Sequence, residues 1–171
     1  RFCQVPSYRN GVIQRFSNNM SEMKRLTACD FEDILQCAML VFEGLFPGDH
    51  DAIIQSLLYR FAHWHTLAKL QVHSKTTLSA LDNTFKKLSG QLHRFHDFMC
   101  ITFTMMELPK ERAAWERRAA CECSGLDNPD AGSGSQKVKK FNLSTYKFHA
   151  MEDYVQSIRL FGTTDSFTMQ L

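Results

Sequence analysis

The chain has 171 residues, of which 44% are hydrophobic and 22% charged, a balance that fits one packed domain and excludes disorder throughout. The net charge of +2 is too small to indicate nucleic-acid binding by itself. No apolar run reaches the about 18 residues of a transmembrane candidate, and the six cysteines lack the spacing of a secreted disulfide scaffold, which favours a reduced, intracellular setting.

Charge is distributed unevenly along the chain. Residues 1–29 are basic, polar and irregular, and we predict that they form a separate basic segment. An acidic range, 30–60, follows, and a second basic range without any acid covers 136–147. Basic ends around an acidic middle predict two separate electropositive patches.

Residues 30–123 are predicted to form a helical bundle. A first helix begins near Asp30, a good N-cap, and its apolar positions continue to Leu45 before a Pro-Gly pair. A second helix is predicted over about 49–73, where apolar residues recur at spacings of three and four.

A third, long helix is predicted from Ser74 to Met106. Gly90 lies inside it and costs about 1 kcal/mol relative to alanine. Its apolar residues alternate in steps of three and four, as in a heptad seam, which suits packing against an antiparallel neighbour or a coiled-coil partner. The predicted interaction face consists of Leu78, Leu81, Phe85, Leu88, Leu92, Phe95 and Met99.

A fourth helix is predicted to begin at Pro109, because proline is favoured in the first turn, and to be short and highly charged. The Gly-, Asp- and Ser-rich range 124–140 is predicted to be a flexible linker. Range 141–171 is predicted to be a C-terminal helix and turn, with the helix ending at Gly162. The expected fold is therefore mainly α, with four to five helices, and the sequence shows no clear strand pattern.

The histidine and cysteine residues are potential metal ligands, but their spacing in the sequence argues against a metal site. His93 and His96 share a helix face without a third ligand at a set spacing, and we interpret them as polar neighbours of the heptad seam. Cys121 and Cys123 are closer in sequence than the usual zinc-binding pair. We predict neither a metal nor any other cofactor.

Catalytic groups are equally poorly supported. Cys37 and Cys100 lie in apolar helical runs and are interpreted as core residues rather than nucleophiles. Glu152 and Asp153 are sequence neighbours that point apart on a helix, and Asp165 follows two threonines as turn residues do. We predict that the chain is not an enzyme.

Nucleic-acid contact has some support from the second basic range, since lysines there precede aromatic residues and an arginine follows on the C-terminal helix. The candidate contact residues are Lys137, Lys139, Lys140, Lys147 and Arg159. Such side chains give non-specific, salt-sensitive affinity for phosphates. A solvated basic loop is the alternative interpretation.

Several word-like strings occur in order along the chain. They read VFEGLxP over 41–47, WHxLAKLxxH over 64–73, YKxHAxxDY over 146–154 and IRxFGTTDS over 158–166, with a weaker ELP at 107–109. Together they resemble the C-terminal region of Plavaka-type transposon proteins of fungi, which are related to the CACTA (En/Spm) DDE transposases.

The resemblance implies that the RNase H-like catalytic core of the family, with its metal-binding acids, lies upstream, so no catalytic residue is carried over. The chain departs from the family at Met151-Glu152, where the family tends to have Leu-Gly. It also stops at a point where the sequence motif continues in the family. We therefore expect a truncated remnant.

Its expected function is that of a non-catalytic helical region of a transposase-like protein that assists DNA contact, in the nucleus if expressed. The alternative is an interaction module that self-associates through the heptad face. The expected partners are DNA, a second copy or the missing remainder of the parent protein, and no membrane.

Overall fold

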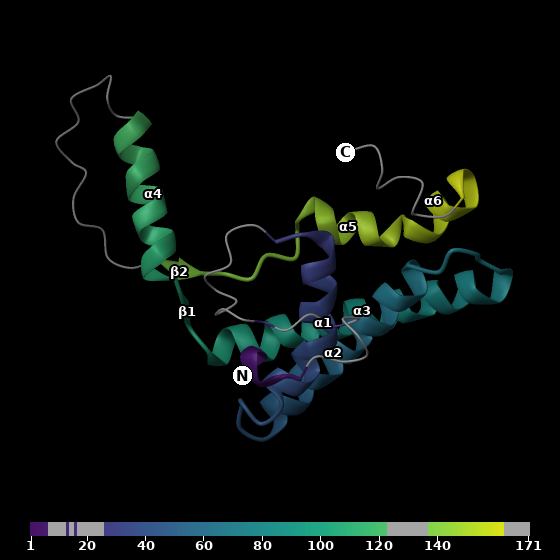
Figure 1. The fold of residues 1–171 in the computed structure, drawn as a ribbon, viewed down its shortest axis with the longest axis horizontal. Coiled ribbons are helices and arrows are strands. Elements are labelled where there is room, and N and C mark those ends of the chain that lie inside the picture. The colour runs from purple at the N-terminus through teal and green to yellow at the C-terminus, as the bar shows by residue number, and fades with distance from the viewer. Residues whose placement is uncertain (7–12, 14–15, 17–25, 123–136, 163–171) are drawn as a thin grey trace. The chain divides into compact units, whose positions relative to one another are not determined.

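The computed structural model describes residues 1–6, 13, 16, 26–122 and 137–162 (Figure 1). Within these ranges the architecture is mainly α, as predicted, with one short two-stranded sheet in addition. Most of the predicted basic segment, the greater part of the predicted linker and the residues after Gly162 lie outside the described residues, together with the predictions made for Cys123 and Asp165.

The chain divides into two compact units. Unit 1 comprises Arg1–Phe95 and Leu143–Leu171, and unit 2 comprises His96–Asn142. Composition suggested different segments, with boundaries after 29, 123 and 140. The grouping differs because it follows packing, and composition does not record which distant segments pack together.

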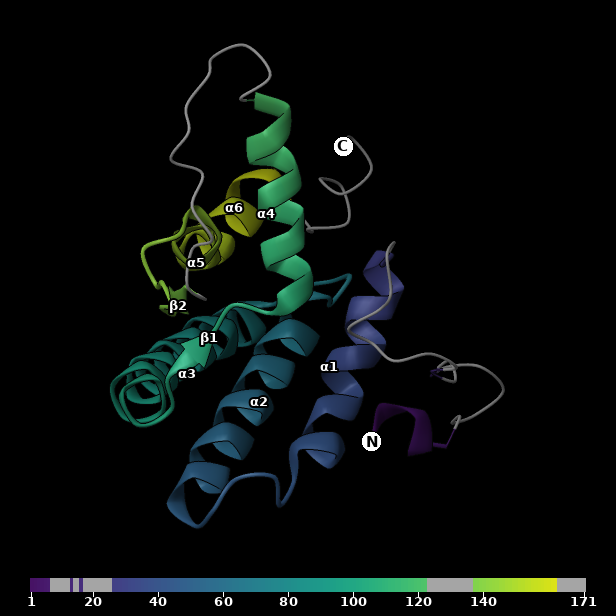
Figure 2. The ribbon, with the colours of Figure 1, turned by 90° about the vertical axis from the view of Figure 1, so that its left-hand side faces the viewer.

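In unit 1, α1 (Ala28–Phe42) and α2 (Asp49–Ala68) lie side by side (Figure 2). Helix α1 begins slightly before the predicted Asp30, because Thr27 is its N-cap and forms a capping box with Asp30. It ends before the predicted limit, and Gly44 follows with a φ of 65°, a left-handed conformation that glycine adopts without strain.

Two polar contacts tie α1 to α2. The Gln55 side-chain amide donates to the Met39 carbonyl at 3.0 Å, and the Lys69 ammonium lies 2.6 Å from the Glu32 carboxylate. Because Lys69 is the C-cap residue of α2, the helix ends there and not near His73 as predicted.

The N-terminal residues pack against α1. Arg1 donates to the carbonyls of Val41 and Glu43 at 3.2 and 2.6 Å, where a cation complements the carbonyl end of the helix. The 3₁₀ turn Phe2–Gln4 follows. This part of the core is built from Phe16, Cys37 and Val41, with Phe2, Val5, Ile13, Ile34 and Phe42 packed against them.

Helix α3 (Lys75–Thr102) carries the predicted heptad seam, and most of the seam is buried. Leu81 and Leu88 have 0% exposure. The other buried members are Leu78, Leu92 and Met99, whereas Phe85 and Phe95 are partly buried. The structure therefore corrects the prediction of a free self-association face: the seam is a core seam, because aliphatic side chains at these spacings are covered by the chain itself.

The C-terminal segment of unit 1 forms α5 (Tyr146–Glu152) and α6 (Tyr154–Phe161), which meet at Asp153, where one helix was predicted. The Tyr154 ring lies edge-on to Trp64 of α2, with centroids 5.1 Å apart, and Ile158 is buried. Gly162, with a φ of 93°, follows the end of α6, as predicted.

In unit 2, the last turns of α3 are followed by β1 (Met105–Met106), α4 (Pro109–Glu122) and β2 (Val138–Lys139). The long helix thus stops before Met106, and two short strands occur where the sequence showed no strand pattern. The strands pair antiparallel, with Met105 opposite Lys139 and Met106 opposite Val138. Strands of two residues leave no periodicity in a sequence, because the alternation needs several positions to be visible.

Candidate nucleic-acid interface

Strand β2 and the residues on either side of it carry three of the predicted contact lysines, all in unit 2. Lys137, Lys139 and Lys140 are all exposed. The backbone N–H of Glu107 donates to the Lys137 carbonyl at 3.0 Å, which extends the pairing of β1 with β2. The range expected to be a linker therefore ends in an ordered strand that holds the lysine backbones in place.

Glu111 joins β2 to α4. Its carboxylate accepts from the Leu108 backbone N–H at 3.1 Å, as at a helix N-terminus, and from the Lys139 ammonium at 2.6 Å. These bonds favour the charged form, so the pKa of Glu111 is lowered, first by the hydrogen bond from Lys139 and then by that from Leu108. Lys139 is consequently partly neutralised, while Lys137 and Lys140 form no ion pair with the described side chains.

Helix α4 adds cations that the sequence analysis did not single out. Lys110, Arg117 and Arg118 are exposed and have no ion pair among the described side chains. At about 100° per residue, Lys110 and Arg117 fall on one side of the helix and Arg118 on the adjoining side, next to Glu111. The adjacent pair Arg117-Arg118 is the signal in the sequence that points to these cations.

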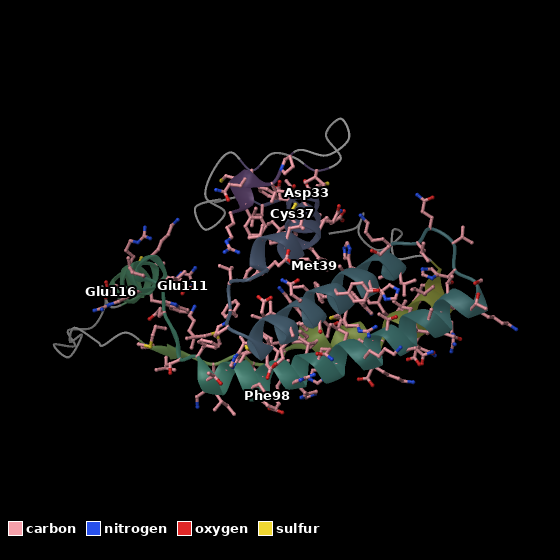
Figure 3. The ribbon with its side chains drawn as sticks, turned by 90° about the horizontal axis from the view of Figure 1, so that it is seen from below. Asp33, Cys37, Met39, Phe98, Glu111 and Glu116 are labelled. Atoms are coloured by element: carbon pink, nitrogen blue, oxygen red, sulfur yellow. The ribbon has the colours of Figure 1, made fainter. Side chains whose placement is uncertain are left out.

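The other side of α4 is neutralised. Arg112 Nε lies 2.8 Å from Glu116 Oε1, an i,i+4 pair, and the periodicity puts both residues away from Arg118. Glu111 and Glu116 leave the helix on different sides (Figure 3). The helix thus has one side with a balanced pair and another with excess positive charge.

Trp115 of α4 is 59% exposed. By the helical periodicity it lies beside Glu111 and Arg118 and on the opposite side from Lys110 and Arg117. The Arg118 guanidinium carbon is 5.4 Å from the centre of the Trp115 ring, a cation–π arrangement. A helix with few other apolar residues cannot cover an indole, so the ring stays in solvent.

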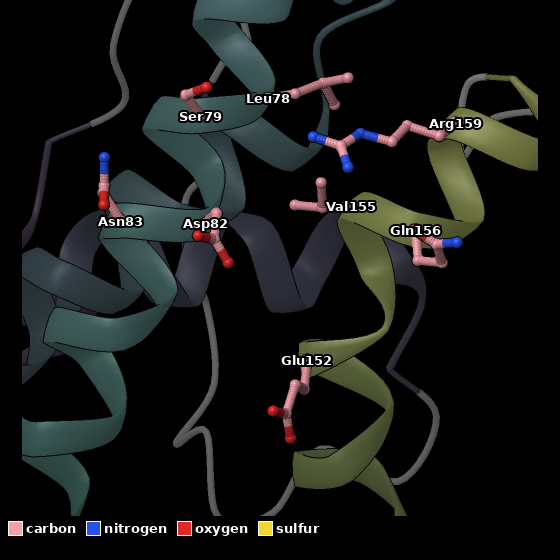
Figure 4. A pocket seen from close by; sticks show the side chains of 8 residues that line it. All are labelled: Leu78, Ser79, Asp82, Asn83, Glu152, Val155, Gln156 and Arg159. Carbon is pink, nitrogen blue, oxygen red and sulfur yellow. The ribbon is translucent and has the colours of Figure 1, made fainter.

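The two remaining predicted contacts, Lys147 and Arg159, lie in unit 1 and are both exposed. Arg159 lines a groove of about 460 Å³ between α3 and α6, together with the carboxylates Asp82 and Glu152 (Figure 4). Asp82 is paired to Lys86 at 2.7 Å. Charges of both signs meet in this groove, which makes it a poor site for a phosphate.

The cysteines singled out from the sequence differ in their surroundings. Cys37 is buried. Its burial raises the pKa of the thiol, and the negative charge of Asp33 raises it further by a smaller amount. Burial also raises the pKa of Cys100, which lines a hollow of about 230 Å³ near β2. A raised pKa disfavours the thiolate that acts as a nucleophile.

The described residues contain no group of three or more His, Cys, Asp or Glu side chains that could hold a metal ion. His96 Nδ1 lies 2.9 Å from the carboxylate of its neighbour Asp97. Glu152 and Asp153 are exposed around the junction of α5 and α6. Within the described part of the chain, no helix combines the length and the apolar character needed to span a membrane.

Comparison with protein-family models, curated proteins and solved structures finds no match for this chain.

Proposed function

We propose that this chain is a non-catalytic helical region similar to the C-terminal region of Plavaka-type transposon proteins, and that it assists its parent protein by contacting DNA. The observation that carries DNA contact is the excess positive charge of α4 and β2 in unit 2. The basic residues there without an ion pair among the described side chains are Lys110, Arg117, Arg118, Lys137 and Lys140.

Phosphate contact is the chemistry that such a surface supports. Exposed lysine and arginine side chains neutralise phosphates and release condensed counterions, which gives affinity without sequence preference. The ordered β2 backbone reduces the entropy lost when Lys137 and Lys140 bind, compared with lysines on an unstructured linker. Lys139 contributes less, because Glu111 already holds it.

The strings that carry the family resemblance include residues used for packing. Trp64, from the string at 64–73, contacts Tyr154, from the string at 146–154. Ile158 and Ala68 are buried. The use of these residues for packing favours a scaffold role over a catalytic one. The proposed partners are DNA and the remainder of the parent protein, and the proposed location is the nucleus.

Binding to duplex DNA across a salt series tests this function. We expect log K to fall linearly with log salt, and the double variant Lys137→Gln/Lys140→Gln to reduce the slope by about one per lysine. The matched control is Lys75→Gln/Lys87→Gln, which removes two exposed lysines of α3 in unit 1 and should leave the slope unchanged. Absence of binding at low salt, or equal slopes for both double variants, would overturn the proposal.

A further inference from the structure

We propose, building on the nucleic-acid contact assigned above to unit 2, that this unit binds single-stranded DNA in preference to duplex, with Trp115 as a base-stacking platform. The observation behind it is an exposed indole with the Arg118 guanidinium over it, on the side of α4 where Glu111 holds Lys139 of β2, a combination that phosphate binding alone does not require.

The stacking surface consists of two neighbouring planar groups. Trp115 is 59% exposed, and the Arg118 guanidinium lies over its ring at 5.4 Å. Bases of a single strand stack on aromatic rings and on arginine planes, and such stacking tolerates any base because every base has a π face. In a duplex the base faces are already stacked on one another and are closed to an indole on a helix surface.

The backbone of the strand finds positive charge beside the platform. On α4 this charge is Arg118, three residues after Trp115, whereas Lys110 and Arg117 lie about 140–160° around the helix from the indole. On the β2 side, the Lys139–Glu111 pair holds the strand against the helix turn that precedes Trp115, and Lys137 and Lys140 lie on either side of Lys139 in the chain. Cations around an exposed aromatic are the typical arrangement of sequence-tolerant single-strand binding.

A protein partner fits the same surface less well. Exposed apolar side chains do occur in this unit, among them Met106 and Leu108. However, the centres of protein interfaces are depleted of charged residues, lysine especially, whereas here the indole lies beside Arg118 and beside the side of α4 that Lys139 contacts. Charge complementarity therefore favours a polyanion over an apolar protein face.

The experiment compares an oligothymidylate with a duplex of the same length, at one salt concentration, for the full-length chain and two variants. We expect tighter binding of the single strand, quenching of tryptophan emission on binding, and a loss of at least about fivefold in single-strand affinity for Trp115→Leu. Trp115→Phe, which keeps a ring, should retain most of the affinity, and duplex affinity should be unchanged in both variants. Trp64 is only 6% exposed, so the quenching reports on Trp115.

Equal single-strand affinity for Trp115→Leu and the unmodified chain would overturn the stacking platform, as would equal losses on single strand and duplex. Duplex binding without single-strand preference would overturn this inference and leave DNA contact intact. No binding of either DNA at low salt would overturn both, and self-association that Trp115→Leu abolishes would identify the surface as a protein interface instead.

Discussion

The contact between Trp64 and Tyr154 makes a sharp prediction, because it joins two strings that lie far apart in the sequence. Tyr154→Leu removes the edge-on aromatic pair, worth about 1 kcal/mol beyond its buried area. Leucine also leaves roughly 20–40 Å² of apolar surface uncovered, which adds about 0.5–1 kcal/mol at about 25 cal/mol per Å². We therefore expect a loss of about 1.5–2 kcal/mol in the free energy of unfolding.

Urea unfolding followed by far-UV circular dichroism measures this loss. With an m-value of about 2 kcal/mol/M, the midpoint of Tyr154→Leu should fall by about 0.7–1 M. In a Trp115→Phe background the emission of Trp64 then reports on unit 1 alone, and the two probes should agree for this unit.

Tyr146 provides the matched control, since it lies on α5 of the same segment and is 85% exposed. Tyr146→Leu should change the free energy of unfolding by less than about 0.5 kcal/mol. Tyr154→Phe keeps the ring and should retain most of the stability. If Tyr154→Leu shifts the midpoint no more than Tyr146→Leu does, the C-terminal segment is not held by this contact and the reasoning fails.

Three further predictions follow from buried and capping residues. Leu81→Ala, at a side chain with 0% exposure, should lower the free energy of unfolding by about 3–4 kcal/mol in the same urea assay. Thr27→Ala should cost about 1 kcal/mol at neutral pH through loss of the capping box. The hydrogen bonds from Thr27 lower the pKa of Asp30 in the folded protein. The stabilisation by this carboxylate is therefore present above the pKa of Asp30 in the unfolded chain, and it is lost as pH falls through the lower pKa of the folded protein. The cost of Thr27→Ala should accordingly shrink below about pH 4. Cys37, buried and with a raised pKa, should be alkylated at least about tenfold more slowly than the exposed Cys29 in the folded protein, as measured by peptide mass spectrometry.

Each of these has its own control. Leu160→Ala, at a side chain that is largely exposed on α6, should be nearly neutral, and comparable losses at both leucines would contradict the assignment of the seam to the core. A cost of Thr27→Ala that does not change with pH would show that Asp30 takes no part in the cap. In strong denaturant Cys37 and Cys29 should react at similar rates, and equal rates in the folded protein would contradict the burial of Cys37.

The α3 seam shows how far periodicity reaches. Spacings of three and four predicted the helix and the side that carries Leu81 and Leu88, because the geometry of a helix depends only on local backbone bonds. The same spacings were compatible with a partner chain or with the chain's own core. Burial of the seam decided between them, and burial depends on neighbours that a one-dimensional pattern does not contain.

The candidate interface shows a second limit. The basic range predicted Lys137 and Lys140 from composition alone, but nothing local distinguished them from Lys139, whose charge is partly neutralised by Glu111 of α4. Arg117, Arg118 and the exposed Trp115 were not assembled with them, because the range between α4 and β2 separates them in the sequence.

The sequence by itself determined the mainly α architecture, the seam of α3 and the two basic ends, since these follow from local periodicity and composition. The tertiary structure alone decided that the seam is core, that β1 pairs with β2, and that Tyr154 packs on Trp64. It also decided that Lys139 pairs with Glu111 and that Arg118 lies over an exposed indole. These features depend on distances between residues remote in the chain, and only folding sets those distances.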